Sequence, residues 1–163
     1  MSDTLITPNQ LLFLLEGTWT GEGRGEFPGV TSFAYREVLR FTRCDENSLA
    51  FEMKTQKCYD GQTEYVPSHA ETGSISPLES GELELVSVQK GRNEALVASI
   101  EPVGAMFRIH FVSKSITNDS RLISSTRTFE LEGDILRYEM SMHTTKVNQL
   151  TSHLKISLQR GKQ

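Results

Sequence analysis

Apolar and polar residues alternate along most of this chain with the period of two that predicts β-strands. Between residues 31 and 41, Phe33, Tyr35 and Leu39 fall on one parity and arginines fall on the other. The stretch 49–56 alternates even more regularly. Comparable stretches occupy residues 19–25, 66–76, 82–90, 94–101, 105–113, 121–131, 134–144 and 153–160. The pattern therefore predicts about ten strands.

Turn-forming residues separate the predicted strands, as at Asp60-Gly61 and Gly91-Arg92-Asn93. No second helical pattern interrupts them, so parallel strand–helix–strand units are not expected. Closing an antiparallel sheet into a barrel removes its unpaired edges, and a barrel of this width has room for a small ligand. We expect an all-β fold, a closed antiparallel barrel of about ten strands. A two-sheet sandwich of the same strands is the alternative.

Only the start of the chain has a helix signature. Thr7 is a candidate N-cap, Pro8 suits the first helical position, and Gln10 completes a capping box. The apolar run 11–15 follows, and Gly17 is well placed to end the helix. Because so short a helix is not stable alone, we expect it to dock on the barrel and cover one end.

Length and composition narrow the class of protein. The 163 residues suit a single domain, 1–163, and 37% hydrophobic with 23% charged residues is typical of a soluble globular chain. A net charge of -4 argues against nucleic acid as a partner, since phosphate binding needs a basic patch. The longest apolar run, 11–15, is too short to span a membrane. The N-terminus has no basic segment typical of a secretory signal, so we expect a cytoplasmic protein.

The two cysteines, Cys44 and Cys58, are too few for a disulfide scaffold. We expect reduced thiols, with a single bridge between them or a redox role as the alternatives. Glu37 and Glu71 fall in strand-like segments, where either could be a buried carboxylate. Glu37 could equally pair with a neighbouring arginine across the sheet. The spacing of these acids defines no paired-carboxylate hydrolase.

The stretch 17–28 is the most unusual part of the sequence. Four glycines, at positions 17, 21, 23 and 25, share odd parity with Trp19, the only tryptophan. In a strand they would line one face and leave a hollow beside the indole. Such a hollow suits close packing of another backbone or a flat ligand, and glycine kinks in a bent barrel strand would give the same pattern without a ligand.

Four histidines occur, at positions 69, 110, 143 and 153, and none shows the spacing of a metal-binding motif. His153 is distinctive because it lies where a predicted loop, 146–152, meets the last strand. At a barrel rim, one imidazole can hold a haem iron from a single side. Strict alternation, however, places His153 on the face opposite Leu154, Ile156 and Leu158.

The glycine-tryptophan stretch resembles the signature GxWxGxGxGx[YF]P of the nitrobindins, which are haem-binding β-barrels related in shape to lipocalins and fatty-acid-binding proteins. Further matches follow in order: Phe33-x-Tyr35-x-Glu37, His69-x-Glu71-x-Gly73, residues 138–142 and Thr151-Ser152-His153-Leu154. The resemblance covers about residues 10–160. It implies a ten-stranded barrel that holds one haem b per chain near its mouth, with a ferric resting iron.

The resemblance also implies roles for particular residues. His153 matches the axial ligand of the iron, and His69 matches a distal histidine that lines the pocket without binding iron, a candidate catalytic residue. Trp19, Gly29 and Thr31 are candidate haem contacts. Many family members have threonine where this chain has Gly29, with Thr31 two residues on, which puts one haem contact in doubt. Ser68 replaces a bulky apolar residue before the distal histidine, a change that would open the pocket to water.

Three functions follow as hypotheses. The first is a haem-dependent isomerase that converts peroxynitrite to nitrate and binds nitric oxide. The second is a module that carries or senses nitric oxide through the same iron. The third is a haem-free, lipocalin-like carrier of a small apolar ligand such as a fatty acid. In each, the partner is a small molecule rather than nucleic acid or a membrane, and the chain is expected to be a monomer or weak homodimer.

Overall fold

The computed structural model describes residues 5–162 and is a closed antiparallel β-barrel with one short helix, as the sequence predicts. Neighbouring strands follow the order β6-β5-β4-β3-β2-β1-β11-β10-β9-β8-β7, and pairing of β6 with β8 closes the barrel. The elements are α1 (Pro8–Leu15), β1 (Gly17–Gly25), β2 (Phe33–Asp45), β3 (Ser48–Tyr59), β4 (Val66–Pro77), β5 (Leu83–Gln89), β6 (Arg92–Ala98), β7 (Ile100–Val103), β8 (Met106–Thr117), β9 (Leu122–Glu132), β10 (Ile135–Thr144) and β11 (Thr151–Arg160).

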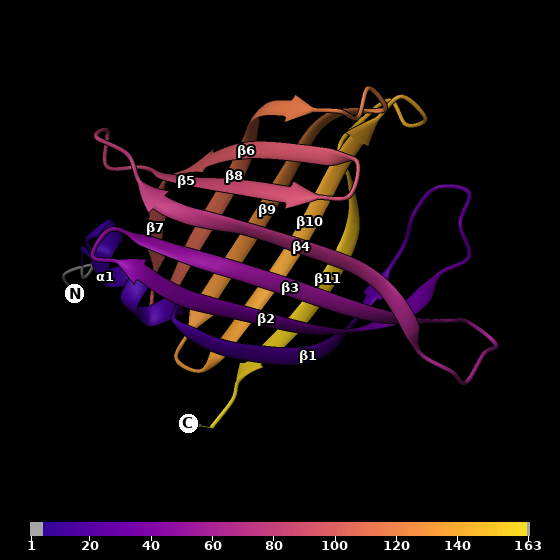
Figure 1. Cartoon of the computed structure of the whole chain (residues 1–163), viewed down its shortest axis with the longest axis horizontal. Helices are drawn as coiled ribbons and strands as arrows, with labels where there is room; N and C mark the ends of the chain where they lie inside the picture. The colour runs from indigo at the N-terminus through magenta and orange to yellow at the C-terminus, as the bar shows by residue number, and fades with distance from the viewer. Residues whose placement is uncertain (1–4, 163) are drawn as a thin grey trace.

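The two ends of the barrel differ. In Figure 1 the strands β1 to β5 cross in front of β8 to β11, and α1 lies at the left end near the N-terminus. The long β1–β2 and β3–β4 connections project at the opposite end. The helix therefore covers one end, and the other end is framed by loops.

The helix forms and docks as its sequence predicts. The Thr7 side chain accepts a hydrogen bond from the Gln10 backbone, and the Gln10 side chain accepts one from the Thr7 backbone, which completes a capping box. Leu11, Leu12 and Leu15 are buried in the barrel core. No helix within the described part of the chain is long and apolar enough to cross a membrane.

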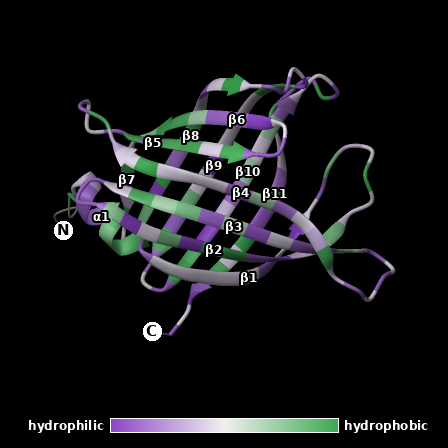
Figure 2. Ribbon diagram, in the orientation of Figure 1, coloured by the Kyte–Doolittle hydropathy of each residue, from purple (hydrophilic) through white to green (hydrophobic). Residues whose placement is uncertain are grey.

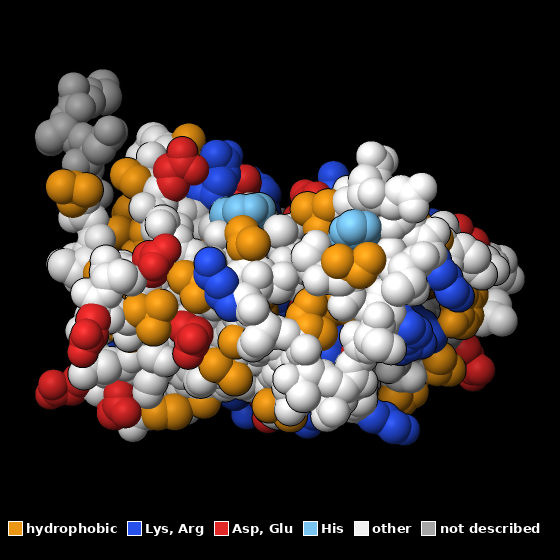
Figure 3. All heavy atoms as spheres, turned by 90° about the horizontal axis from the view of Figure 1, so that it is seen from above, with side chains coloured by type: hydrophobic (Ala, Val, Ile, Leu, Met, Phe, Trp, Pro, Cys, Tyr) orange, Lys and Arg blue, Asp and Glu red, His pale blue; other side chains and the backbone are white. Residues whose placement is uncertain are grey.

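The alternating pattern places one face of each strand inside the barrel. On β2 the buried positions are Phe33, Tyr35, Glu37, Leu39 and Phe41, and the intervening side chains face outward. Figure 2 shows the same alternation as bands of hydrophobic and hydrophilic residues along the strands, and Figure 3 shows basic, acidic and hydrophobic side chains interspersed on one outer face. Both cysteines are free thiols, one exposed and one buried.

One predicted strand is divided in two. The sequence predicts a single strand over 94–101, whereas β6 ends at Ala98 and β7 begins at Ile100. Both segments pair with β8, so they follow one path interrupted at Ser99. β7 is thus an extension beyond a ten-stranded barrel rather than an additional wall.

The glycines of β1 allow close packing between backbones. A Cβ added at Gly21 would lie well inside contact distance of the Ser157 carbonyl oxygen, and one at Gly23 would lie 2.9 Å from the Ile156 Cβ. A Cβ at Gly25 would overlap the Phe33 ring. The structure therefore supports the packing explanation of this glycine face, because β11 and Phe33 already fill the hollow.

We expect Gly21→Ala to destabilise the protein by about 2–3 kcal/mol, because the methyl group must displace β11 backbone in a close-packed wall. Chemical denaturation would measure the change. Glu22→Ala is the matched control: its exposed side chain makes only a surface ion pair with Arg36, so the cost should stay under about 1 kcal/mol. Equal losses in the two variants would contradict the packing explanation.

Candidate functional site

A cavity of about 410 Å³, here called the inner cavity, enters the barrel at the end opposite α1. Loop residues Phe27 and Val30 lie at its rim, and strand residues from β2, β3, β4, β5, β6, β10 and β11 form its walls. The lining residues are Phe27, Val30, Phe33, Tyr35, Glu37, Met53, Thr55, Lys57, Tyr59, Ser68, His69, Glu71, Gln89, Arg92, Tyr138, Met140, Met142 and Leu154. Its size suits a small organic ligand.

A second hollow of about 280 Å³, here called the outer hollow, adjoins the inner cavity. It is lined by Phe27, Pro28, Val30, Arg92, Asp119, Arg121, Leu122, Met142, Thr144, Thr145, Lys146 and His153. Phe27, Val30, Arg92 and Met142 line both spaces. The boundary between the two hollows is therefore made of side chains rather than of sheet backbone.

His153 points inward because β11 contains a bulge. Met140 pairs with Leu154 and the next residue, Ser141, pairs with Ser152, so His153 is left without a partner on β10. Such an extra residue turns the alternation by one position. His153 is consequently 3% exposed, although strict alternation placed it on the opposite face from Leu154 and Ile156. The expected orientation of His153 is wrong, and the bulge is the physical reason for the difference.

The tautomer of His153 follows from its hydrogen bond. Its Nδ1 lies 2.5 Å from the Thr151 carbonyl oxygen, which can only accept, so Nδ1 must carry the proton and donate it. The neutral ring then has a lone pair on Nε2. Within residues 5–162, the Nδ1 contact is the only hydrogen bond of the His153 side chain, so Nε2 makes none. A fixed neutral imidazole with a free Nε2 is the form that binds a metal.

Phe27 holds the other side of this imidazole. The two ring centroids are 4.9 Å apart with an interplanar angle of 60°. The Glu26 backbone N–H donates to the His153 carbonyl oxygen at 2.8 Å, which ties the β1–β2 loop to the bulge. The loop thus fixes both the backbone and the ring of His153.

His69 lies in the inner cavity rather than beside His153. Its Nε2–H donates to the Glu71 carboxylate at 3.2 Å, and the side chain is 38% exposed. The structure therefore places the two histidines expected on either side of a haem in adjoining spaces, with Phe27 and Met142 at the boundary.

The other candidate haem contacts lie outside both hollows. Gly29, with a positive φ of 75°, and Thr31 flank Val30 in the β1–β2 loop but line neither space. Trp19 is fully buried, and its Nε1–H donates to the Leu15 carbonyl oxygen at 2.9 Å. The Arg160 guanidinium stacks on its indole at 4.3 Å. Trp19 joins the helix to the barrel, and we therefore leave these three residues out of the proposed site.

Sequence reasoning missed a buried ionic network beside the inner cavity. Arg127 is 1% exposed and forms ion pairs with Glu71 on β4 and, at 3.0 Å, with Glu94 on β6. Burial alone would raise the pKa of Glu71, but the charge of Arg127 and hydrogen bonds from His69, Arg127 and Ser87 outweigh it and lower the pKa to about 2. One signal was available: Arg127 shares parity with the inward-facing Phe129 and Leu131.

Glu37 is also a buried acid, but its pKa is shifted in the opposite direction to that of Glu71. It is 2% exposed, and neither carboxylate oxygen has a hydrogen-bond partner among the described residues. Burial raises its pKa to about 8, assisted by the charge of Glu71 and opposed by that of Arg127. Of the two sequence expectations for Glu37, a buried carboxylate is confirmed and an arginine pair across the sheet is wrong, because Arg36 on the outer face pairs with Glu22.

This raised pKa predicts the pH dependence of stability. Between about pH 4.5 and 8 the folded chain keeps the Glu37 proton that the unfolded chain releases, so rising pH favours unfolding across that window. We expect Glu37→Gln to remove this loss. The free energy of unfolding of the variant minus that of the parent should therefore be roughly 3–5 kcal/mol larger at pH 9 than at pH 4.5. Denaturation across the pH range would measure it. Parallel curves for the parent and the variant would show that Glu37 is not neutral in the fold.

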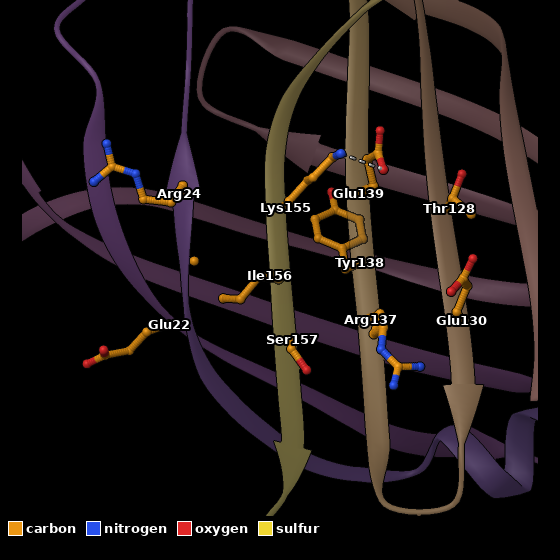
Figure 4. Close-up of a pocket in the computed structure, with 11 residues that line it drawn as sticks. Glu22, Arg24, Thr128, Glu130, Arg137, Tyr138, Glu139, Lys155, Ile156 and Ser157 are labelled. Atoms are coloured by element: carbon orange, nitrogen blue, oxygen red, sulfur yellow. Dashed lines mark ion pairs between the residues drawn. The ribbon is translucent and has the colours of Figure 1, made fainter.

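A further hollow, of about 470 Å³, lies on the outer wall over β1, β9, β10 and β11. Figure 4 shows Lys155 directed toward Glu139 there, an ion pair of 3.8 Å. Arg24 pairs with Asp60, and Glu22 pairs with Arg36. Charged groups that already pair at an exposed surface offer little to a ligand, so this hollow is a weaker candidate than the inner cavity and the outer hollow.

The family model described as "THAP4-like, heme-binding beta-barrel domain" matches residues 9–160. The chain belongs to this family, which confirms the resemblance drawn from the sequence. It is 36% identical over 155 residues to a protein named peroxynitrite isomerase Rv2717c from Arabidopsis thaliana, covering 90% of this chain and 85% of that one. It is 34% identical to peroxynitrite isomerase 1 of Mycolicibacterium paratuberculosis, covering 78% and 80%.

The fold is also that of a solved relative. The crystal structure of Rv2717c from M. tuberculosis matches with a TM-score of 0.82 and 28% identity, covering 97% of this chain and 99% of that one. For a haem-binding family, the described residues offer a suitable axial ligand in His153, whose Nε2 is free and whose ring is fixed on both sides. His153 therefore fits the requirement of a haem site.

Proposed function

We propose that this chain binds one haem b through His153 and, in that form, isomerises peroxynitrite to nitrate. The observation that carries the proposal is the buried His153 imidazole with its Nδ1–H given to the Thr151 carbonyl oxygen. The names of the relatives, peroxynitrite isomerases, support the reaction. Bound haem would supply an iron that acts on the O–O bond of peroxynitrite as a Lewis acid and one-electron partner.

The remaining residues of the site orient the His153 imidazole and enclose the inner cavity. The Thr151 carbonyl keeps the His153 lone pair on Nε2, and Phe27 restricts rotation of the ring. Met140, Met142 and Leu154 present apolar surface to the inner cavity, which limits water there.

His69 is the proposed catalytic residue on the cavity side. Glu71 accepts the Nε2–H of His69 and thereby leaves Nδ1 as the ring atom available to a ligand. Glu71 stays ionised at neutral pH because its pKa is about 2. Protonation of His69 would make Nδ1 a donor to a bound anion, and Glu71 is the positioning residue that keeps the ring in this orientation.

The test is stopped-flow decay of peroxynitrite with the haem-loaded chain, combined with product analysis. We expect faster decay without any added reductant, nitrate as the dominant product and less nitration of added tyrosine. His69→Ala should slow the decay while haem affinity stays unchanged. Decay no faster than with free haem would refute the isomerase proposal.

Nitric oxide binding is part of the same proposal. A single protein ligand to iron leaves a position for a diatomic ligand. We expect the haem-loaded chain to bind nitric oxide with a shift in its visible spectrum. If nitric oxide binds but peroxynitrite decay is not accelerated, the chain is a nitric oxide carrier or sensor instead.

A further inference from the structure

The inner cavity contains a polar group that the haem proposal does not use. Both carboxylate oxygens of Glu37 and the hydroxyl of Tyr35 are buried without a hydrogen-bond partner among residues 5–162. Both side chains line the inner cavity. Buried polar groups are nearly always hydrogen-bonded, so two unpaired groups facing one cavity point to a partner that enters it.

The surroundings of Glu37 decide the charge of that partner. Its register neighbours are Gly21 on β1 and Thr55 on β3, neither of which titrates. The charged or titratable groups near it on the other elements are Glu71 on β4, Arg127 on β9 and Tyr138 on β10, with Tyr35 on its own strand. Arg127 already pairs with Glu71 and Glu94, so it offers no free positive charge to an anion.

The acids dominate the immediate surroundings of Glu37, although Lys57 and Arg92 line the same cavity. The charge of Glu71 opposes ionisation of Glu37 more than the charge of Arg127 favours it. A cation placed beside Glu37 would therefore be stabilised by Glu37 and Glu71 together, whereas a fatty-acid carboxylate would meet two acids. A fatty-acid carboxylate is therefore disfavoured beside Glu37, and Lys57 is the cationic lining residue at which it could bind instead.

The walls suit an organic cation rather than a metal ion. Aromatic rings of Phe33, Tyr35, Tyr59 and Tyr138 line the cavity together with methionine side chains. The Lys57 ammonium already lies 4.8 Å from the Tyr59 ring centroid and 5.6 Å from that of Phe33, so Tyr35 and Tyr138 are the rings left to a ligand. Aromatic faces attract ammonium groups and also bury apolar surface.

We propose that the inner cavity binds a small apolar amine in its protonated form, with the ammonium group against Glu37 and the apolar body among the aromatic rings. The ammonium donates hydrogen bonds to the Glu37 carboxylate and the Tyr35 hydroxyl. Glu37 releases its proton to solvent as the cation enters, so the pair formed is carboxylate and ammonium. The amine uses neither Nε2 of His153 nor an iron, but it enters the cavity that His69 and the methionines line, so haem and amine are expected to compete and the amine is tested on the haem-free chain.

Proton release gives a test that needs no variant. Burial raises the pKa of Glu37 to about 8, so the acid is mostly protonated at pH 7 and a bound ammonium should release most of one proton. We would titrate the full chain with 2-phenylethylammonium by calorimetry at pH 7 in phosphate and in MOPS, whose different ionisation heats report the proton count. The neutral 2-phenylethanol and the anionic 3-phenylpropanoate are probes of matched size. We expect the amine to bind at least about tenfold more tightly than the alcohol, and the acid to bind more weakly than both.

Three variants identify the site. Glu37→Gln should reduce the amine to within about twofold of the alcohol and abolish proton release, while alcohol binding stays unchanged. Glu46→Gln, at the exposed β2–β3 turn, is the matched control and should behave as the parent. His153→Ala should keep amine binding even where haem binding is lost, so failure of the haem proposal is distinguishable from failure of this one.

Several outcomes would overturn the proposal. Equal affinity for amine and alcohol, or no proton release in the parent chain, would show that Glu37 does not receive the cation. No saturable binding of any probe would show that the unpaired groups are satisfied by water alone. Amine binding that needs His153 and shifts the haem spectrum would be ligation of iron by the amine.

Discussion

Replacing His153 with alanine is expected to lower haem affinity by more than about 100-fold and to remove the spectrum of a histidine-ligated ferric haem. Losing a residue that merely orients a metal ligand typically costs 10- to 100-fold in affinity, so losing the ligand itself should cost more. Stability should change little, because the side chain lies at a bulge near the barrel rim rather than in the central core. Haemin titration followed by visible absorption, run beside denaturation, measures both quantities.

His110→Ala is the control for His153→Ala. His110 is exposed on β8, and its Nδ1 lies 2.8 Å from the Thr128 hydroxyl oxygen, away from both hollows. Its loss should leave one saturable haem per chain and an unchanged spectrum. If His153→Ala binds haem as the parent does while His110→Ala does not, the proposed axial ligand is wrong.

The elements of the fold were predictable because each depends on local sequence. Period-two alternation marks the strands, and the capping box at Thr7 marks the only helix signature. The orientation of His153 was not predictable in this way. It depends on the register between β10 and β11, where one extra residue reverses the alternation. The sequence around His153 contains no local sign of that bulge.

The ionic network was hidden for a different reason. Glu71, Glu94 and Arg127 come from β4, β6 and β9, and barrel closure rather than sequence proximity brings them together. Parity alone marks Arg127 as inward-facing, but it does not identify the partners that make burial of the charge tolerable. For the same reason the sequence left open whether Glu37 is buried or paired with an arginine.

The network also explains how two nearby acids have opposite protonation states. Glu71 receives the direct contact of Arg127, so it remains charged, whereas Glu37 has no such contact and keeps its proton at neutral pH. Because Arg127 pairs with Glu71 and not with Glu37, Glu71 is an ionised acid that orients His69 and Glu37 is a neutral acid that faces the inner cavity. Removing Arg127 should therefore affect both acids as well as stability.

We expect Arg127→Met to destabilise the protein by about 3–5 kcal/mol at neutral pH, because it leaves Glu71 buried without its arginine and Glu94 with only the longer contact to Arg92, at 3.4 Å. The pKa of Glu71 would rise, since burial would no longer be offset by the charge of Arg127. In the parent, ionised Glu71 contributes stability above about pH 4.5 that is lost as pH falls toward 2. The variant should lack this loss and should be least impaired in acid.

The triple variant Arg127→Met, Glu71→Gln, Glu94→Gln separates the charge effect from packing. It removes the two carboxylate charges that lose Arg127 while keeping side chains of similar volume, so it should recover most of the stability lost in Arg127→Met. Denaturation at pH 7 and pH 4 measures the recovery. A triple variant no more stable than Arg127→Met would mean that the guanidinium acts mainly by filling space between β4, β6 and β9. A different result would be a stable triple variant that shows slower peroxynitrite decay with unchanged haem affinity. That result would mean that the network serves mainly to orient His69 and not to stabilise the fold.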